Sequence, residues 1–339
     1  MDRKLASIQK VTSVEPIEGA DRIEKIRVMG WDVVAQKAEF KTGDQCVFFE
    51  IDSLLPDSNP EFAFMERSKY RVRTMKLRGV LSQGLALPLS VLDVQMSDHH
   101  IQSPPWEEGA DVTELLGVTQ WEPPAKFNMG GIRGNFPFYV PKTDETRVQS
   151  ALGTIDELRG LTCYITEKVD GTSATFSHRD GDFHVCSRNL SLKPDDASAH
   201  WRMARKYDLE KKLPELGNFA IQAEMCGPRV QNNRLMLKGL DIFVFSIYDI
   251  DNTRFLGYND MMEVVIDLGL NPVKTLGLPA TVFDMDLDGL LEMAEGTYEG
   301  TDNPREGIVV RPMEEQYSAT LQGRLSFKVL SNTFLLKEK

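Results

Sequence analysis

The stretch from Thr166 to Phe176, TEKVDGTSATF, holds a lysine in a position where it could do chemistry. Lys168 follows an apolar run, LTCYI, and lies between two acids, Glu167 and Asp170, where a strand is expected to stop. A lysine amine becomes a nucleophile only when its pKa falls from about 10.4, because the ammonium has no lone pair. Burial, a nearby cation or a metal can lower that pKa. Asp-Gly pairs are also common in turns, so this stretch alone leaves open a surface lysine in a turn.

Further polar residues follow Lys168 at the ends of strand-like runs. The segments are SRN at 187–189, AEMCG at 223–227, FSIYD at 245–249, EGIVVR at 306–311 and SFKV at 326–329. They supply an arginine, a first glutamate, aromatic residues, a second glutamate and a second lysine, in that order.

The order of these segments resembles the covalent nucleotidyltransferase superfamily of polynucleotide ligases and messenger-RNA capping enzymes. The match runs through motif I (EKVDG), motif Ia (SRN), motif III (FSIYD), motif IV (EGIVV) and a lysine-bearing motif V (SFKV). The whole chain is similar to RNA ligase family 5, the Deinococcus and Naegleria type. The first half contributes EGADRIEKIRVMGW, FKTGDQCVFFEIDSLLP and KLRGVLSQGLALPLS to that resemblance, and PKTDETRVQ follows at 141–149.

The resemblance implies an ATP-dependent RNA ligase that joins 3′-hydroxyl and 5′-phosphate ends at nicks in duplexes. The lysine attacks the α-phosphorus of ATP, the AMP passes to a 5′-phosphate, and a 3′-hydroxyl then displaces the AMP. Lys168 would be the adenylated nucleophile, and Lys328 the cation beside the α-phosphate. Motif V often has two lysines, but Ser326 occupies the first position here, with Arg324 as a possible substitute.

The resemblance also implies a divalent ion, Mg²⁺ or Mn²⁺. Asp170, Glu224 and Glu306 would hold it directly or through water, because magnesium keeps several of its waters and takes few carboxylates. The alternative is that these acids are strand-end residues in ordinary salt bridges. The five histidines show no metal-ligand spacing and are interpreted as surface or core residues.

The remaining candidate residues would bind the nucleotide. Arg188 would contact the ribose or a phosphate, unless it forms a structural ion pair. Tyr248 would stack on adenine, with Phe245 as the alternative if the other face of the strand points inward, and core packing is possible for either. Glu167 would read the edge of adenine or face solvent. A further pair, Arg147 and Gln149, would close over the nucleotide or belong to a hinge.

The elements that position these residues divide the chain in two. Residues 1–120 carry short β-like runs separated by turns, which predicts a small barrel or sandwich, and the resemblance implies an N-terminal OB-fold β-barrel. Residues 121–141 are rich in proline and glycine and are predicted to be a linker. Residues 142–339 mix strands with helices expected at 197–213, 260–268 and 286–294. That pattern predicts an antiparallel α+β domain. The resemblance implies that this domain is the nucleotidyltransferase domain, with an ATP-grasp-like ligase fold.

The length, the cysteines and the net charge of the chain limit the kinds of protein that it can be. A chain of 339 residues favours two domains, and no apolar run approaches the roughly 20 residues that span a bilayer. Four scattered cysteines predict reduced, mostly buried thiols in a cytoplasmic protein. A net charge of −12 argues against a surface that binds nucleic acid everywhere. We expect a monomer that binds RNA or a nicked RNA-containing duplex and no membrane.

Local basic patches are still possible. RSKYRVRTMKLR, at 67–78, has six cations and no acid. As a strand it would place Arg67, Lys69, Arg71 and Arg73 on one face, where they could contact phosphates or simply be solvated.

Two other functions remain open from the sequence. One is an ATP-dependent DNA ligase of the same superfamily, which would differ in its contacts to the 2′-hydroxyl. The other is a non-catalytic OB-fold protein that binds nucleic acid and has a degenerate nucleotidyltransferase half. The presence of Lys168, Glu306 and Lys328 favours the enzyme.

Overall fold

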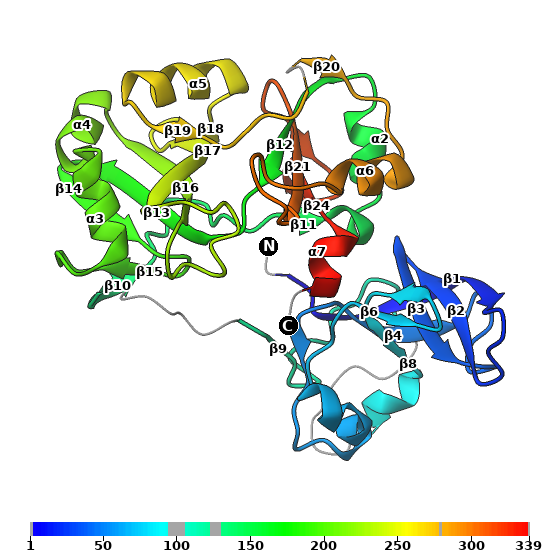
Figure 1. The fold of residues 1–339 in the computed structure, drawn as a ribbon. Helices are drawn as coiled ribbons and strands as arrows, with labels where there is room; N and C mark the ends of the chain where they lie inside the picture. The colour runs from blue at the N-terminus through cyan, green and yellow to red at the C-terminus, as the bar shows by residue number, and fades with distance from the viewer. Residues whose placement is uncertain (1–2, 94–105, 123–129, 278–279, 338–339) are drawn as a thin grey trace. The chain divides into compact units, whose positions relative to one another are not determined.

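The computed structural model describes residues 3–93, 106–122, 130–277 and 280–337. The chain forms two compact units (Figure 1), of which the first comprises Met1–Pro123 with Leu335–Lys339 and the second comprises Pro124–Phe334. The division falls inside the segment 121–141 that was predicted as a linker, and residues 335–339, predicted in the second domain, are grouped with unit 1. None of the helices within the described ranges combines the length and the apolar character that crossing a membrane requires.

Unit 1 is built on a five-stranded antiparallel sheet in the order β3-β2-β1-β4-β8. The strands are β1 (Ala6–Pro16), β2 (Ile23–Val28), β3 (Trp31–Gln36), β4 (Gln45–Phe49) and β8 (Leu85–Leu87). Two short pairs accompany the sheet: β5 (Ser53–Leu54) with β9 (Thr119–Gln120), and β6 (Met75–Leu77) with β7 (Val80–Ser82). Along β3 every second residue is buried, as expected of a strand with one face on the core. The pairing of β1 with β2 shifts register between Val11 and Ser13, as at a β-bulge.

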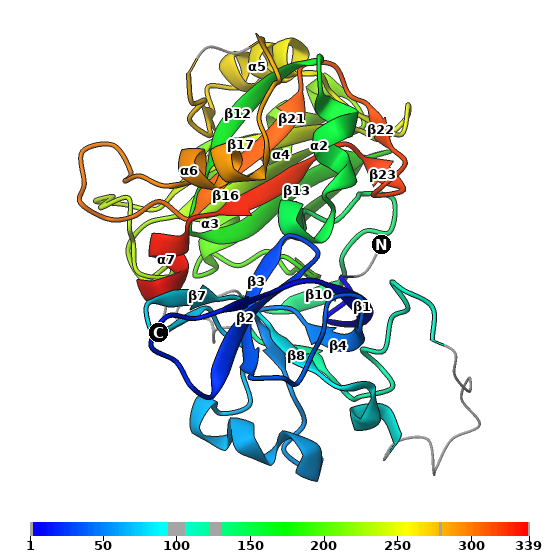
Figure 2. The same cartoon turned by 90° about the vertical axis from the view of Figure 1, so that its right-hand side faces the viewer.

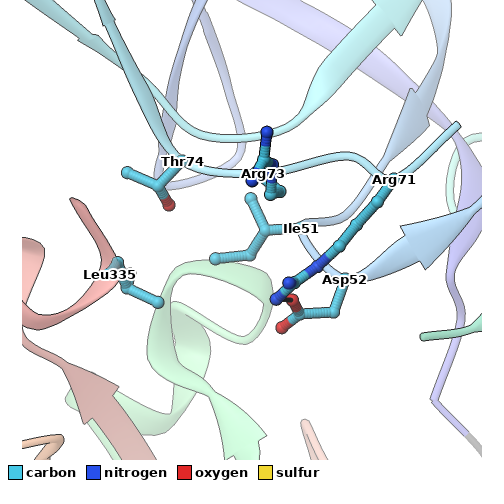
Figure 3. Close-up of a pocket in the computed structure, with 6 residues that line it drawn as sticks. All are labelled: Ile51, Asp52, Arg71, Arg73, Thr74 and Leu335. Carbon is cyan, nitrogen blue, oxygen red and sulfur yellow. Dashed lines mark hydrogen bonds and ion pairs between the residues drawn. The ribbon is translucent and has the colours of Figure 1, made fainter. Parts of the chain in front are cut away.

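The expected basic strand over Arg67–Arg73 is not formed. A 3₁₀ helix occupies Pro60–Ser68, and Lys69 and Tyr70 both have positive φ, of 54° and 59°. Arg71 is buried: its guanidinium bonds the carboxylate of Asp52 at 2.7 Å and stacks 3.4 Å from the ring centre of Trp121. Figure 3 shows Arg71 reaching toward Asp52. The prediction of a four-residue stripe on one strand face was wrong, because the turn breaks the two-residue alternation and one of the cations serves packing.

The larger sheet of unit 2 has eight strands. Their path is β10-β15-β14-β13-β16-β17-β18, with β19 parallel to β17. The bounds are β10 (Ile132–Asn135), β13 (Thr172–Arg179), β14 (Asp182–Cys186), β15 (Leu190–Leu192), β16 (Phe219–Cys226), β17 (Asp241–Asp249), β18 (Arg254–Phe255) and β19 (Asn271–Pro272). Three helices, α3 (Ala199–Lys206), α4 (Leu209–Leu216) and α5 (Tyr258–Asp267), bury an apolar face against one side of this sheet (Figure 1).

The second sheet of unit 2 has the order β11-β24-β21-β12-β20. Its strands are β11 (Thr146–Arg147), β12 (Thr162–Lys168), β20 (Thr281–Val282), β21 (Gly307–Pro312) and β24 (Phe327–Leu330). The helices α2 (Gly153–Leu158) and α6 (Leu287–Ala294) pack with one face of β12, β21 and β24 (Figure 2). A short pair, β22 (Tyr317–Ser318) and β23 (Gly323–Arg324), precedes β24, and α7 (Asn332–Lys337) follows it. Most pairings in unit 2 are antiparallel, as predicted.

The predicted helices are present with shifted bounds. The helix expected at 197–213 is two helices, because Tyr207 ends α3 and Asp208 has a left-handed φ of 52°. Gly257 precedes the first residue of α5. In α6 the side chain of Asp286 caps the helix by accepting a hydrogen bond from the Gly289 amide.

The residues predicted as a linker are in part structured. Residues 123–129 lie outside the described residues, but β10 pairs with β15 and so belongs to the larger sheet of unit 2. All four cysteines are free and buried, as expected.

Candidate active site

Lys168 is the last residue of β12, and the pleat of the strand decides where its side chain points. Cys163 and Ile165 face the apolar cluster under α2 and α6, so Thr166 and Lys168 project from the opposite face. Across the sheet, Lys168 pairs with Gly307, the first residue of β21. The sequence therefore places a lysine at a strand end directly beside Glu306.

The ammonium of Lys168 is held among carboxylates. Its Nζ lies 2.7 Å from Oε1 of Glu306, and the Lys168 side chain is 23% exposed. Burial alone would lower the pKa of Lys168, but the negative charges of Glu306, Glu224 and Asp170 outweigh it and raise the pKa above its ordinary value. In this state the lysine is a protonated ammonium. The stabilising effect of the acids must be weakened, and the ammonium must lose its proton, before the amine can attack.

The acids around Lys168 are crowded. Burial, assisted by Glu306 and Asp170 and opposed by Lys168, raises the pKa of Glu224 to about 8. Burial and the charge of Glu306 raise the pKa of Asp170 to about 6, although Arg234 lowers it by donating from Nε to Oδ2 at 2.7 Å. The cluster thus holds more negative charge than its surroundings neutralise, which is an environment that favours an added cation.

These carboxylates fit a hydrated divalent ion better than a fully protein-coordinated one. In the part of the chain that the structure describes, no group of three or more His, Cys, Asp or Glu side chains is arranged to hold a metal ion directly. Mg²⁺ commonly takes one or two carboxylates and keeps water in its other positions. Three acids that converge on Lys168 without forming a closed cage match that mode of binding. His99 and His100 lie outside the described residues.

Two glycines allow the acid-bearing segments to approach one another. A Cβ on Gly171 would lie 2.4 Å from the carbonyl oxygen of Met225 on β16. A Cβ on Gly307 would lie 2.0 Å from the carbonyl oxygen of Val329 on β24. Both distances are too short for any side chain. Glycine is therefore required after Asp170 and after Glu306, because at both places the backbone passes close to the backbone of a neighbouring strand.

Lys328 lies on the same sheet face as Lys168. On β24 it pairs with Val309, which in turn pairs with Thr166 on β12. On its other side, Lys328 is the parallel partner of Arg147 on β11. This row therefore places two cationic residues on the side of the sheet from which the Lys168 side chain projects.

Comparisons with known proteins agree with this arrangement. An RNA ligase family model matches residues 161–330, and an OB-fold domain model matches residues 5–89. The chain resembles Naegleria gruberi RNA ligase with pyrophosphate at 36% identity and a TM-score of 0.88, over 98% of each chain. It resembles mutants of that ligase with ATP and manganese, and with AMP and manganese, at 35% identity and a TM-score of 0.87, again over 98% of each chain. No curated protein sequence matches at a significant level.

The chain belongs to the RNA ligase family. Its first unit has an OB-fold and its second has the ligase fold, so the fold expected from the sequence is confirmed. The non-catalytic alternative is excluded at the level of family, because the chain is a ligase whose Lys168, Glu306 and Lys328 are brought to one sheet.

Ser326, which stands at the first lysine position of motif V, has a structural contact in this RNA ligase. Its hydroxyl accepts a hydrogen bond from Nε of Arg311 at 3.0 Å. Arg311 is 1% exposed and pairs with Glu145 at 2.7 Å. Arg324, the suggested substitute, pairs with Glu315 and donates to the hydroxyl of Ser246 at 2.7 Å. Both arginines are therefore engaged with protein groups.

Glu167 and Arg188 have protein partners in the ligase. The Glu167 side chain lies on the other face of β12 from Lys168, 3.8 Å from Arg305. Burial raises the pKa of Glu167, against the opposing charges of Lys274 and Arg305. The Arg188 guanidinium bonds the Asp144 carboxylate at 2.6 Å, which is the ion pair left open as its alternative.

The aromatic candidates of the ligase lie at two different places. Phe245 belongs to a cluster with Val169, the neighbour of Lys168. Tyr248 is 8% exposed and packs with Val140, with its ring 5.0 Å from that of Phe255. Opposite Gln222 and Ala223, strand β17 contains a bulge in which Phe245 is the extra, unpaired residue. The bulge shifts the alternation of side chains, so Phe245 and Tyr248 lie on the same face of β17. The two residues are therefore not the mutually exclusive alternatives that regular alternation predicts.

The remaining pair, Arg147 and Gln149, is buried in the ligase at 5% and 2% exposure. Oε1 of Gln149 has no hydrogen-bond partner among the described residues. A buried acceptor in that state is typical of a site that is completed by a ligand or by water.

Sequence reasoning missed three residues that contact this site: Arg234, Tyr298 and Arg311. Arg234 and Tyr298 lie in loops, where no periodicity marks a buried side chain. Arg311 was visible only as the last residue of EGIVVR, and a charged residue inside an otherwise apolar strand is the one signal that could have indicated it.

Proposed function

We propose that this RNA ligase uses ATP to join a 3′-hydroxyl end to a 5′-phosphate end at nicks in RNA-containing duplexes, by way of AMP bound covalently to Lys168. The observation that carries the proposal is the position of the Lys168 amine, which is partly buried among three carboxylates on a sheet face that also carries Lys328. The related Naegleria structures hold ATP, AMP with manganese, and pyrophosphate, which are the donor, the transferred group and the leaving group of such a reaction.

In the first step, the Lys168 amine forms a bond to the α-phosphorus of ATP as the bond to pyrophosphate breaks. The amine must first lose a proton, and the Glu306 carboxylate at 2.7 Å is in position to accept it. Lys328 offsets the charge that develops on the α-phosphate oxygens.

A divalent ion, Mg²⁺ or Mn²⁺, would offset negative charge on the phosphates and the acids when it is bound. Asp170, Glu224 and Glu306 are the residues that would hold it, in part through water. Their excess of negative charge, seen in the raised pKa values of Glu224 and Asp170, supports this assignment.

In the second step, an oxygen of an RNA 5′-phosphate takes the AMP from Lys168, which regains its free amine. In the third, a 3′-hydroxyl attacks that activated phosphate, a phosphodiester forms, and AMP leaves. Both steps are again displacements at phosphorus, so the same cations and acids serve all three.

For recognition of the nucleotide we propose Phe245 as the aromatic residue nearest the base, because it packs against the apolar cluster that contains Val169. Gln149, with its open acceptor, and Arg147, in the row of Lys328, are proposed to contact the nucleotide. The ion pair of Arg188 would have to open for a ribose or phosphate contact, and the protein contacts of Tyr248 and Glu167 favour a structural role for each.

Labelling with ATP tests the proposal directly. The protein is incubated with α-labelled ATP and Mg²⁺ or Mn²⁺ and then run on a denaturing gel. We expect a labelled band in the wild type and in Lys206→Ala, but none in Lys168→Ala. Lys206 is a control lysine on α3 that pairs with Asp241. Absence of label in the wild type with either metal would refute the covalent route.

The choice of substrate needs a second assay. Nicked duplexes with ribose or deoxyribose at the 3′-hydroxyl side are compared for sealing rate. Faster sealing of the ribose nick supports an RNA ligase acting at RNA 3′ ends. Equal or faster sealing of the deoxyribose nick would contradict it and support the DNA-sealing alternative.

A further inference from the structure

Tyr298 is a buried residue that the proposed chemistry does not use, although it lies at the centre of the site. Its hydroxyl accepts hydrogen bonds from the Asp170 amide at 2.9 Å and the Glu306 amide at 3.0 Å, and donates one to the Lys168 carbonyl oxygen at 3.0 Å. A phenol has one proton to donate and two lone pairs, so this hydroxyl is fully used. The Tyr298 side chain is 2% exposed, so water cannot readily replace these bonds.

The three backbone groups belong to the two segments that carry the reactive side chains. Lys168 ends β12, Asp170 follows in the turn, and Glu306 directly precedes β21. The antiparallel pairing between β12 and β21 ends at Lys168 and Gly307. Beyond that point the Tyr298 hydroxyl continues the connection between the two segments.

The loop that carries Tyr298 is itself closed by several bonds. Thr297 and Pro304 form an isolated bridge at its base, and the Tyr298 amide donates to the Asn303 carbonyl oxygen at 3.1 Å. The Thr301 amide and hydroxyl both donate to the Tyr298 carbonyl oxygen, at 3.1 and 3.0 Å. After the loop, the guanidinium of Arg305 donates to carbonyl oxygens at the end of α6. The phenol is therefore presented from a loop with little freedom to shift.

We propose that Tyr298 is a positioning residue for adenylation of Lys168. By fixing the main chain of Lys168, Asp170 and Glu306 to one atom, it sets the geometry between the amine and its proton acceptor. The 2.7 Å contact between Nζ of Lys168 and Glu306 depends on both segments being held in register. This inference rests on the proposed covalent chemistry, and it assigns to Tyr298 no contact with ATP or RNA.

The test compares Tyr298→Phe with the wild type in the full chain. Rates of label transfer from α-labelled ATP to the protein are measured over a range of ATP concentrations. We expect the maximal rate to fall about 10- to 100-fold, because displacements on the order of 1 Å at a reacting centre have effects of that size. The KM for ATP should change by less than about threefold, because the nucleotide contacts remain.

Tyr207→Phe provides the matched control. The Tyr207 hydroxyl also bonds polar partners, but these are the side chains of Asp241 and Asn271 and not the backbone of the Lys168, Asp170 or Glu306 segments. We expect its maximal rate to stay within about twofold of the wild type. A Tyr298→Phe rate within twofold of the wild type overturns the proposal, as does a fall matched by the control or accompanied by an equal rise in KM.

A milder variant covers the case in which Tyr298→Phe does not fold. Thr301→Val removes the hydroxyl that donates to the Tyr298 carbonyl oxygen and accepts from the Asn303 amide. A fall of about threefold or more in the maximal rate with unchanged KM supports the proposal, and an unchanged rate overturns it. If the wild type takes no label, the proposed function fails. If the wild type labels and these variants label equally fast, only the role of Tyr298 fails.

Discussion

Replacing Glu224 with glutamine removes one of the three carboxylates that crowd around Lys168 and should change how stability depends on pH. The pKa of this acid is raised from an ordinary 4.5 to about 8, chiefly by burial. Between those values the folded chain keeps a proton that the unfolded chain releases. The free energy of unfolding therefore falls as pH rises through this window, and the loss is complete above about pH 8.

The size of the effect follows from the shift. A change from 4.5 to about 8 corresponds to a loss of at most about 5 kcal/mol between the two ends of the window. Glutamine cannot ionise, so Glu224→Gln escapes this loss. We compare the free energy of unfolding of the variant with that of the wild type in the presence of a chelator that removes metal. From below pH 5 to above pH 8, this difference should shift in favour of the variant by up to about 5 kcal/mol.

Urea denaturation in a chelator at about pH 5 and about pH 8.5 measures the difference. Trp201 is the single tryptophan between residues 124 and 334 and is 3% exposed, so its signal in protein labelled with fluorinated tryptophan reports unit 2 alone. Glu263→Gln, at an exposed position on α5, is the control and should follow the wild type at both pH values. A stability difference between Glu224→Gln and the wild type that is equal at both pH values would show that this acid does not titrate as argued.

Three further outcomes are expected. Gly307→Ala should lower the free energy of unfolding by about 3 kcal/mol or more, because its Cβ would lie 2.0 Å from a carbonyl oxygen of β24. Gly239→Ala is the control and should lower it far less, because a Cβ there would have nothing within 4 Å. Arg71→Ala should destabilise unit 1 by about 2 kcal/mol, because the ion pair and the stacked ring are lost. The signal of Trp121 in protein labelled with fluorinated tryptophan monitors this, and an unchanged midpoint would contradict the structural role of Arg71. Addition of Mn²⁺ above pH 8 should raise the melting temperature of the wild type more than that of Glu224→Gln, and an equal rise would argue against that acid as a metal-holding residue.

The sequence alone was enough to predict the candidate site residues that lie at the ends of strands. Lys168 and Glu306 each stand at the border of an apolar run, and the pairing of β12 with β21 brings those borders together. The helices at 260–268 and 286–294 were also predictable, because their apolar residues recur with helical spacing. Chain length and the change of pattern after residue 120 indicated two domains, but the pattern did not give the position at which the two units divide.

The rest depended on features that leave no periodic signal. The bulge at Phe245 shifts the alternation along β17, so counting by twos from Phe243 misplaces Tyr248. Positive φ at Lys69 and Tyr70 ended a strand that the cations of 67–78 had indicated. Tyr298 lies in a loop whose composition resembles any turn, and only the folded chain shows that three backbone groups converge on its hydroxyl.

The place of β24 in the smaller sheet has a consequence for the synthesis of the chain. This strand lies between β11 and β21, and it pairs Phe327 with Thr146, 181 positions earlier in the sequence. A nascent chain that has not yet emerged as far as residue 327 therefore has both neighbouring strands but a gap between them, and it lacks Lys328. Contacts this distant in sequence also form slowly. Ligase competence should thus appear abruptly and late, after translation has passed β24, and any premature stop upstream should leave an exposed sheet edge that quality-control proteases can recognise.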